Sequence, residues 1–172
     1  MTIFFIVTMV GISQTEKEYY YLGVDSYNQQ KYSDAIENFT KAIQLVPDNE
    51  RCYNNRGMAK EMLHDYSGAI TDYSIAIVLN PKDTSAYINR GNARCQVHDF
   101  KGGIEDFNKA IELDSNNPRI YYNRGTAKSD LNDLLEAVKD YDTAIKLDPE
   151  YSMAYTNRAN AKADLQDYKG AV

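Results

Sequence analysis

The sequence is poor in the residues that build disulfide frameworks, metal centres and sites for polyanions. Its 172 residues include no tryptophan, four prolines, two cysteines and two histidines. Acidic residues outnumber basic ones, and the net charge is -6 with a pI near 4.9. A chain of this charge has no general attraction for nucleic acid or anionic lipid. We therefore exclude nucleic acid as a partner.

Long hydrophobic runs are scarce as well. The run Ile3–Ile12 has ten residues, too few for a membrane-spanning helix. Gly11 and Ser13 before Gln14 look like a signal cleavage site, although no Lys or Arg precedes the run. For residues 1–15 three interpretations stay open: an export-signal remnant, an apolar capping segment or a cloning artefact. The first implies an exported or periplasmic protein, and the others a cytoplasmic one.

The chain does contain a repeat. The stretch Tyr53–Lys60 (YNNRGMAK) returns three times, each copy 34 residues further on. A fixed period of this length predicts a solenoid, in which each unit buries its apolar face against its neighbours. The repeats begin near Glu16, Glu50, Thr84, Pro118 and Ser152, so the array covers 16–172.

Each repeat reads as two helices joined by a short polar turn. In the second repeat we expect helices over 51–63 and 66–79, with His64-Asp65 as the turn. Apolar residues in the second helix are spaced by three and four, which marks one helical face. The fold class is therefore all-α, a solenoid of stacked antiparallel helix hairpins. We expect four complete hairpins, a fifth first helix, and a chain that stops five residues into a fifth second helix.

Small and aromatic residues recur in register. Mid-helix glycines cost up to about 1 kcal/mol relative to alanine, so we expect a neighbouring helix to pass too close there for a Cβ atom. These glycines are Gly23, Gly57, Gly91 and Gly125, and the small residues predicted to face them are Ala35, Ala69 and Ala137. A seam between successive hairpins is predicted from Phe39, Tyr73, Phe107 and Tyr141 with Ala42, Ala76, Ala110 and Ala144.

These positions resemble the tetratricopeptide repeat (TPR) family over nearly the whole chain. The period, the glycine, alanine and aromatic registers, and the prolines Pro47, Pro81 and Pro149 all match. Tyrosine stands where the family often has tryptophan, and Ser115, Ala159 and Gly103 depart from the pattern. The resemblance implies a right-handed superhelix whose first helices line a concave face.

The two cysteines, Cys52 and Cys95, fall at opposite ends of the first helix in adjacent repeats. Their register separates them by about 13 Å along the helix axis, whereas a disulfide needs Cα atoms within about 7 Å. We expect two free thiols.

Charges recur too. Arg56, Arg90 and Arg124 are each followed sixteen residues later by an aspartate: Asp72, Asp106 and Asp140. We interpret these as ion pairs joining the two helices of a hairpin, with a basic ladder for an acidic partner as the alternative. A second column (Lys60, Arg94, Lys128, Lys162) is accompanied by turn aspartates (Asp65, Asp99, Asp133, Asp167). The first repeat has Leu22 and Asn38 in place of the Arg–Asp pair.

Catalytic constellations are absent from the sequence. His64 and His98 occupy equivalent turns about 10 Å apart, too far to share one zinc ion, and we expect both to be solvated. No phosphate-binding loop or nucleophile elbow appears. We predict a protein that is not an enzyme, with no catalytic residue, metal or cofactor.

A row of asparagines is the candidate binding site. Asn55, Asn89, Asn123 and Asn157 recur on the first helices and have no partner that recurs with them in the sequence. In the O-linked N-acetylglucosamine transferase repeats a similar row holds the backbone of an extended peptide, and an amide offers both a donor and an acceptor for this. The alternative is that these amides bond to neighbouring backbone. Further candidates on the same face are Asn54, Met58, Asn92, Arg119, Tyr122 and Asn160.

The predicted function is a scaffold that binds an extended peptide or partner helix of another protein in its groove. Co-chaperone members of the family use a two-carboxylate clamp, but here only Asn89, Arg119 and Asn123 suit it, so chaperone-tail binding is not expected. Two alternatives are a substrate-presenting arm of an enzyme whose catalytic domain lies beyond Val172, and a module that self-associates through exposed repeat ends.

Gly102-Gly103 should be the weakest interior point of the array. Two glycines at the start of a helix cost roughly 1–2 kcal/mol relative to alanines. We expect faster amide hydrogen exchange near Gly103 than near Ala69 or Ala137, measured by mass spectrometry, and equal protection would contradict this.

Overall fold

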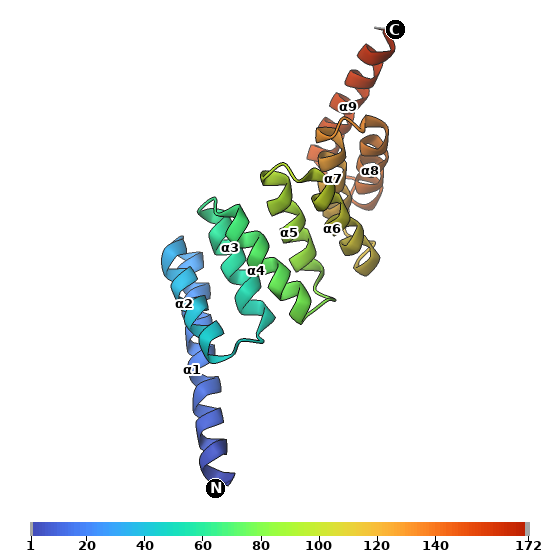
Figure 1. Cartoon of the computed structure of the whole chain (residues 1–172). Helices are drawn as coiled ribbons and strands as arrows, with labels where there is room; N and C mark the ends of the chain where they lie inside the picture. The colour runs from blue at the N-terminus through green and yellow to red at the C-terminus, as the bar shows by residue number, and fades with distance from the viewer. Residues whose placement is uncertain (1, 171–172) are drawn as a thin grey trace. The chain divides into compact units, whose positions relative to one another are not determined.

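The computed structural model describes the backbone of residues 2–170 and the side chains of residues 15–166. This part of the chain is helical throughout and contains no strand (Figure 1). In chain order, the helices of the N-terminal half are α1 (Thr2–Asn28), α2 (Tyr32–Leu45), α3 (Glu50–Met62) and α4 (Tyr66–Leu79). They are followed by α5 (Thr84–Gln96), α6 (Phe100–Leu113), α7 (Pro118–Asp130), α8 (Leu134–Leu147) and α9 (Ser152–Gly170).

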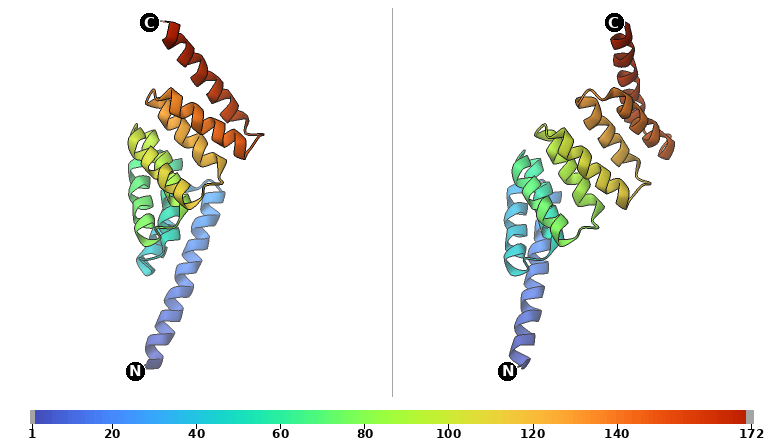
Figure 2. Two further views of the ribbon diagram at one scale, coloured as in Figure 1. Left: turned by 90° about the vertical axis from the view of Figure 1, so that its right-hand side faces the viewer. Right: turned by 45° about the vertical axis from the view of Figure 1, so that its right-hand side comes forward.

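The chain divides into two compact units, one ending at Ala86 and the other starting at Tyr87. In the first unit α1 and α2 form one antiparallel hairpin, and α3 and α4 form the next (Figure 2). In the second unit α7 and α8 form a hairpin that packs against α6 on one side and α9 on the other. The predicted all-α solenoid of stacked hairpins is confirmed.

A tight turn closes each hairpin at a fixed position. Four residues there have positive φ: Gln30, His64, His98 and Asn132. At the end of α3, His64 N–H donates to the Glu61 carbonyl and Asp65 N–H donates to the Lys60 carbonyl, the pair of bonds that defines a Schellman motif. The side chain of Asp65 then caps α4 by accepting from the Gly68 N–H at 2.9 Å. One short segment therefore ends one helix and starts the next, as the sequence predicted for His64-Asp65.

The recurring glycines touch aromatic rings. A Cβ atom on Gly23 would lie 2.6 Å from the Phe39 ring, and one on Gly57 would lie 2.6 Å from the Tyr73 ring. Both rings are buried and come from the second helix of the same hairpin. The prediction of a close approach is confirmed, and a Cβ atom on Gly125 would also lie 3.2 Å from the carbonyl oxygen of Ala137, one of the small residues predicted to face the glycines. An aromatic side chain reaches across the hairpin because its flat ring fills the space that the missing Cβ leaves.

The same rings also connect one hairpin to the next. In the first unit Ala35 and Phe39 of α2 cluster with Ala59 of α3. In the second unit Ala137 and Tyr141 of α8 cluster with Ala161 of α9. Phe39 and Tyr141 thus pack between successive hairpins as predicted, but the alanines in these clusters are not the predicted Ala42 and Ala144, which are buried elsewhere in the core.

The two ends of the array differ from the sequence-based boundaries. Helix α1 is continuous from Thr2, so residues 2–15 share one helix with the first repeat, and their side chains up to residue 14 lie outside the described part. Helix α9 runs unbroken to Gly170, so the expected turn and start of a fifth second helix are wrong. A helix of a few residues is unstable alone, and continuing α9 avoids it. Among the described residues, no helix combines the length and apolarity that a bilayer crossing needs.

Gly103 stands where the other repeats have alanine, and the structure shows why. A Cβ atom there would lie 2.6 Å from the Cys95 sulfur and 3.1 Å from the Gly91 carbonyl oxygen. We predict that Gly103→Ala destabilises the chain by about 1–3 kcal/mol through overpacking, despite alanine's higher helix propensity. Urea unfolding followed by circular dichroism measures this.

The control is the same change after Cys95→Ala has removed the sulfur. In that background Gly103→Ala should stabilise by about 0.5–1 kcal/mol. Stabilisation in the wild-type background would show that Cys95 is not the constraint.

Candidate functional site

Each arginine of the recurring column is clamped by its aspartate. Arg56 holds Asp72 with two parallel bonds, Nε to Oδ2 at 2.9 Å and Nη2 to Oδ1 at 2.7 Å. Arg90 with Asp106 and Arg124 with Asp140 repeat this geometry. The three aspartates are at most 4% exposed. The predicted ion pairs within the hairpins are confirmed, so this column is occupied inside the protein.

The arginine also contacts the preceding hairpin and a tyrosine of its own helix. The Nη1 atom of Arg56 donates to the Thr40 hydroxyl of the preceding hairpin at 3.0 Å, and Arg124 donates likewise to Asn108 at 2.7 Å. The guanidinium lies over the ring of the tyrosine three residues earlier, with 5.5 Å from Arg56 to the Tyr53 centroid. We call this recurring arrangement of Tyr, Arg and Asp the brace. It joins three helices at one point.

The second basic column forms ion pairs with the same aspartates as the arginines. Lys60 pairs with Asp72 at 2.7 Å, and Lys128 pairs with Asp140 at 2.8 Å. The expected pairing with turn aspartates is wrong for both. Arg94 does come near one, at 3.7 Å from Asp99, while Asp65 and Asp99 each also cap the following helix.

The first repeat replaces the brace with neutral groups. Asn38 stands where the other repeats have the buried aspartate, and its amide lies 3.5 Å from the Ser26 hydroxyl. Leu22 stands in the arginine position and is 51% exposed. In the first four repeats, arginine, lysine and aspartate are therefore present together or absent together, as a buried charge requires.

The asparagine row has partners that sequence reasoning missed. Asn55 donates from Nδ2 to the Tyr20 hydroxyl at 3.2 Å, and Asn157 donates to the Tyr122 hydroxyl at 3.1 Å. Asn123 donates to the Asn92 carbonyl oxygen at 2.9 Å. Each bond ends on the first helix of the preceding repeat. No one residue type pairs with the asparagines in every repeat, but these three do have partners, and the partners are side chains instead of neighbouring backbone.

The choice of partner follows from the residue just after the repeat tyrosine. Where that residue is Tyr20 or Tyr122, its hydroxyl can accept a bond. In the third repeat the residue is Ile88, which cannot accept one, and Asn123 bonds to Asn92 one turn further on. The asparagines thus hold side chains on the first helix of the preceding repeat.

A cavity of about 200 Å³ lies between α1, α2 and α3 in the first unit. Its lining is mostly apolar: Val24, Tyr27, Asn28, Phe39, Asn55 and Met58. No charged side chain belongs to this described lining. The cavity therefore suits an uncharged, apolar group.

A second cavity, of about 400 Å³, occupies the equivalent position in the second unit. Its walls are the facing first helices α5 and α7, and its floor is Phe107. The remaining lining residues are Asn92, Cys95, Gln96, Arg119, Tyr122, Asn123, Thr126, Ala127 and Asp130. Polar and charged groups dominate here, in contrast to the first unit.

The two cavities contain Asn55, Met58, Asn92, Arg119, Tyr122 and Asn123 of the predicted site. Asn54, Asn89, Asn157 and Asn160 lie outside these two linings, although Asn157 positions Tyr122. Sequence reasoning missed Tyr27, Cys95, Gln96 and Asp130. It also assigned Phe39 and Phe107 to the core alone, whereas their outer edges form cavity floors. Each of these two phenylalanines lies in the repeat that precedes a candidate asparagine. This position in the sequence could have predicted the contact.

Tyr122 is the most tightly held residue of the second cavity. Its ring centroid lies 5.0 Å from that of Tyr151 and 6.0 Å from that of Tyr141. Burial raises the pKa of the Tyr151 hydroxyl, and the proximity of Tyr122 adds to this effect. Burial therefore favours the neutral form of the Tyr151 hydroxyl.

The cysteines are free thiols, as predicted. Burial raises the pKa of Cys52 to about 12, and the nearby Glu16 carboxylate, 3.7 Å from the sulfur, adds to the effect. Burial likewise raises the pKa of Cys95 to about 11. A nucleophilic thiol needs a lowered pKa, so neither sulfur has the character of a catalytic group.

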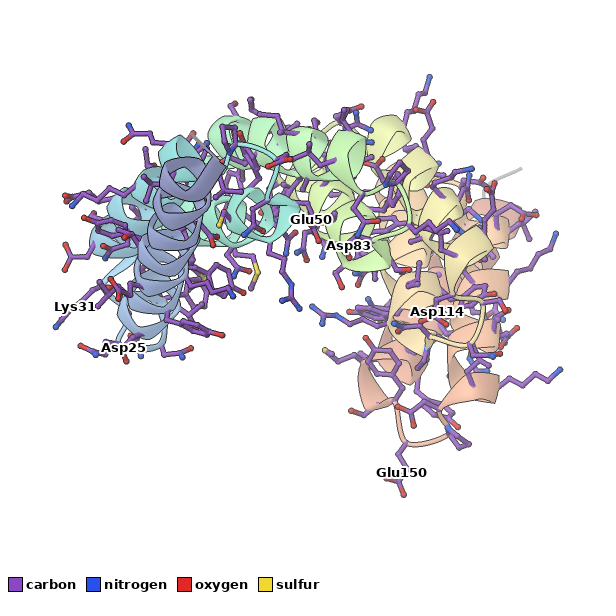
Figure 3. All side chains as sticks on the ribbon, turned by 90° about the horizontal axis from the view of Figure 1, so that it is seen from below. Asp25, Lys31, Glu50, Asp83, Asp114 and Glu150 are labelled. Carbon is purple, nitrogen blue, oxygen red and sulfur yellow. The ribbon has the colours of Figure 1, made fainter. Side chains whose placement is uncertain are left out.

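The histidines occupy exposed turns, as predicted, and His64 bonds to the Tyr66 hydroxyl at 2.9 Å. Charged loop residues such as Glu150 point into solvent (Figure 3). Among the described residues no group of His, Cys, Asp and Glu is arranged to hold a metal ion.

Comparison with known proteins places these features in a family. A tetratricopeptide repeat model matches residues 118–151, and a TPR repeat model matches residues 25–63 and 99–131. Together the matches span more than half of the chain. The chain belongs to the tetratricopeptide repeat family. No curated protein matches it.

Solved structures agree on the fold. MamA from Desulfovibrio magneticus RS-1 (residues 41 to the end) superimposes with a TM-score of 0.85 at 18% identity, covering 91% of this chain and 89% of that one. YrrB, a TPR protein with an unusual peptide-binding site, gives 0.78 at 22% identity, covering 86% and 76%. The first TPR domain of Spaghetti (RPAP3), bound to the HSP90 peptide SRMEEVD, gives 0.68 at 28% identity, covering 70% and 95%.

The brace yields a stability prediction. Asp140→Asn removes the only anion shared by Arg124 and Lys128, which lie in a half-buried site. We expect a loss of about 3–5 kcal/mol in the free energy of unfolding, measured by urea denaturation. Asp142→Asn, which breaks the exposed pair with Arg158, should cost at most about 1 kcal/mol.

A triple change that copies the first repeat tests the cause. Arg124→Leu and Lys128→Ser added to Asp140→Asn should recover part of the loss, because no unpaired cation is left. If the triple variant is less stable than Asp140→Asn alone, uncompensated charge is not the reason.

Proposed function

We propose that the chain is a non-enzymatic interaction module that binds an extended peptide of another protein along its first helices. The observation that carries the proposal is the hydrogen bonding of the asparagines on the first helices. Asn55, Asn123 and Asn157 each use Nδ2 to bond the preceding repeat, which holds each amide in one orientation. A repeated, fixed acceptor suits the N–H groups of a peptide backbone.

The two cavities support the same proposal. Each unit has a cavity beside its own asparagine, apolar in the first unit and polar in the second. Backbone bonds to the asparagines would give affinity, and side chains entering the cavities would give selectivity. The peptide bound to the Spaghetti TPR domain and the peptide-binding site of YrrB favour this function for the family.

A second function, self-association, is favoured by the first repeat. Tyr21 is 66% exposed and Leu22 is 51% exposed, at positions where later repeats have the Asn and Arg that contact the preceding repeat. An apolar face at the point of inter-repeat contact suits a second copy. Light scattering of the protein alone at two concentrations separates the two functions. A module that only binds peptides has the same molar mass at both concentrations, whereas a self-associating one does not.

The test of the main proposal is selection of random peptides on the immobilised protein, followed by titration of the enriched peptides. Asn89→Ala with Asn123→Ala should weaken binding of such a peptide by about 1–3 kcal/mol, the cost of lost hydrogen bonds in a shielded site. The free energy of unfolding should fall only slightly. Asn116→Ala, in an exposed loop, should leave affinity unchanged and is the matched control.

Arg90→Ala with Arg124→Ala should do the opposite, lowering stability more than affinity, because the arginines are engaged in the brace. Unchanged affinity in the asparagine double variant would assign the row a purely structural role.

A further inference from the structure

The cavity of the second unit contains two charged side chains among its described lining residues, and they have opposite signs. Arg119 and Asp130 stand at the two ends of α7 and both are exposed. Neither forms an ion pair with a residue whose side chain the structure describes. The neighbouring charges are neutralised: Arg124 and Lys128 by Asp140, and Arg94 by Asp106. The groove therefore has one positive end and one negative end.

These two charges oppose the electrostatics of their own helix. The N-terminus of a helix favours anions and its C-terminus favours cations. Arg119 is the second residue of α7, and Asp130 is the last. Both are thus placed where they weaken the helix, which speaks against a stabilising role for either.

Both charges face the groove side of α7. Arg119 is close enough to Tyr151 to lower the pKa of its hydroxyl, against the larger effect of burial, and Tyr151 stacks on the cavity residue Tyr122. Asp130 adds to the pKa increase that burial causes in Cys95 of α5, on the opposite wall. The uncharged amides Asn92 and Asn123, which bond to each other, lie in the same lining.

The spacing fits a short extended segment. Eleven residues at a rise of about 1.5 Å place the two Cα atoms about 16 Å apart along the helix axis. An extended peptide rises about 3.3 Å per residue, so this distance corresponds to about five residues.

We propose that the groove of the second unit selects an extended peptide with an acidic side chain against Arg119 and a basic side chain, about five residues away, against Asp130. The charge pair also sets the orientation of the peptide along α7. A carboxylate clamp gathers several cations at one point, whereas this groove separates one cation from one anion. The inference rests on the proposed function and adds to it the chemistry of the ligand.

The experiment is selection from a random peptide library on the immobilised chain. Enriched peptides should carry one acidic and one basic residue about five positions apart. Replacing both residues by glutamine in an enriched peptide should weaken its binding about five- to tenfold, since each exposed ion pair contributes less than about fivefold. On Arg119→Glu, which makes both ends negative, the enriched pool should shift to peptides with two basic residues.

A matched control separates recognition from helix stability. Lys101 is the second residue of α6, as Arg119 is of α7, and it is exposed and outside the cavity lining. Lys101→Glu and Arg119→Glu should both raise the melting temperature, by about 1–4 °C. Only Arg119→Glu should alter the enriched pool.

Orientation is read with a nitroxide label at the acidic end of an enriched peptide. In the wild-type chain the label should broaden the amide resonance of Ile120 more than that of Ser129. In the exchanged variant, Arg119→Glu with Asp130→Lys, the order should reverse. An enriched pool without the charge pattern, or a pool unchanged by Arg119→Glu, overturns this inference and leaves the proposed function standing. A library with no enrichment at all overturns both.

Discussion

The buried carboxylate of each brace is the constraint on which the stacking of the hairpins depends. An aspartate that is nearly inaccessible to water needs compensating charge and hydrogen bonds, and Arg56 and Lys60 supply both to Asp72. The arginine must then stay extended across the hairpin, which leaves Nη1 to reach the preceding one. A single ionised group thus fixes both the angle within a hairpin and its contact with the neighbour.

The brace also separates structure from recognition on the first helices. Because arginine and lysine are engaged on the side of the second helices, the asparagines beside them are left to face the groove. Their Nδ2 groups hold the groove residues of the preceding repeat. For the proposed peptide complex, side chains that are already held by hydrogen bonds lose less entropy on binding.

Much of this fold could be predicted from the sequence because each structural feature recurs at the same position in several repeats. The period, the small residues and the paired charges located the hairpins, the seams and the arginine clamps. The partners of Gly23 and Asn55 could not be predicted. One is a ring that crosses the hairpin and the other is a hydroxyl in the preceding repeat. Both contacts depend on the direction of a side chain, which the repeat period does not determine. The same holds for Asp130, whose register holds a different residue type in most other repeats.

Each unit contains a single cysteine, and this has a practical consequence. Cys52 is fully inaccessible, and its pKa of about 12 keeps it protonated at neutral pH. An alkylating reagent can modify it only after the first unit opens locally, and the same holds in part for Cys95 of the second. The rates of labelling at the two sulfurs therefore report the opening of each unit separately. The native chain thus contains its own pair of probes for cooperativity between repeats.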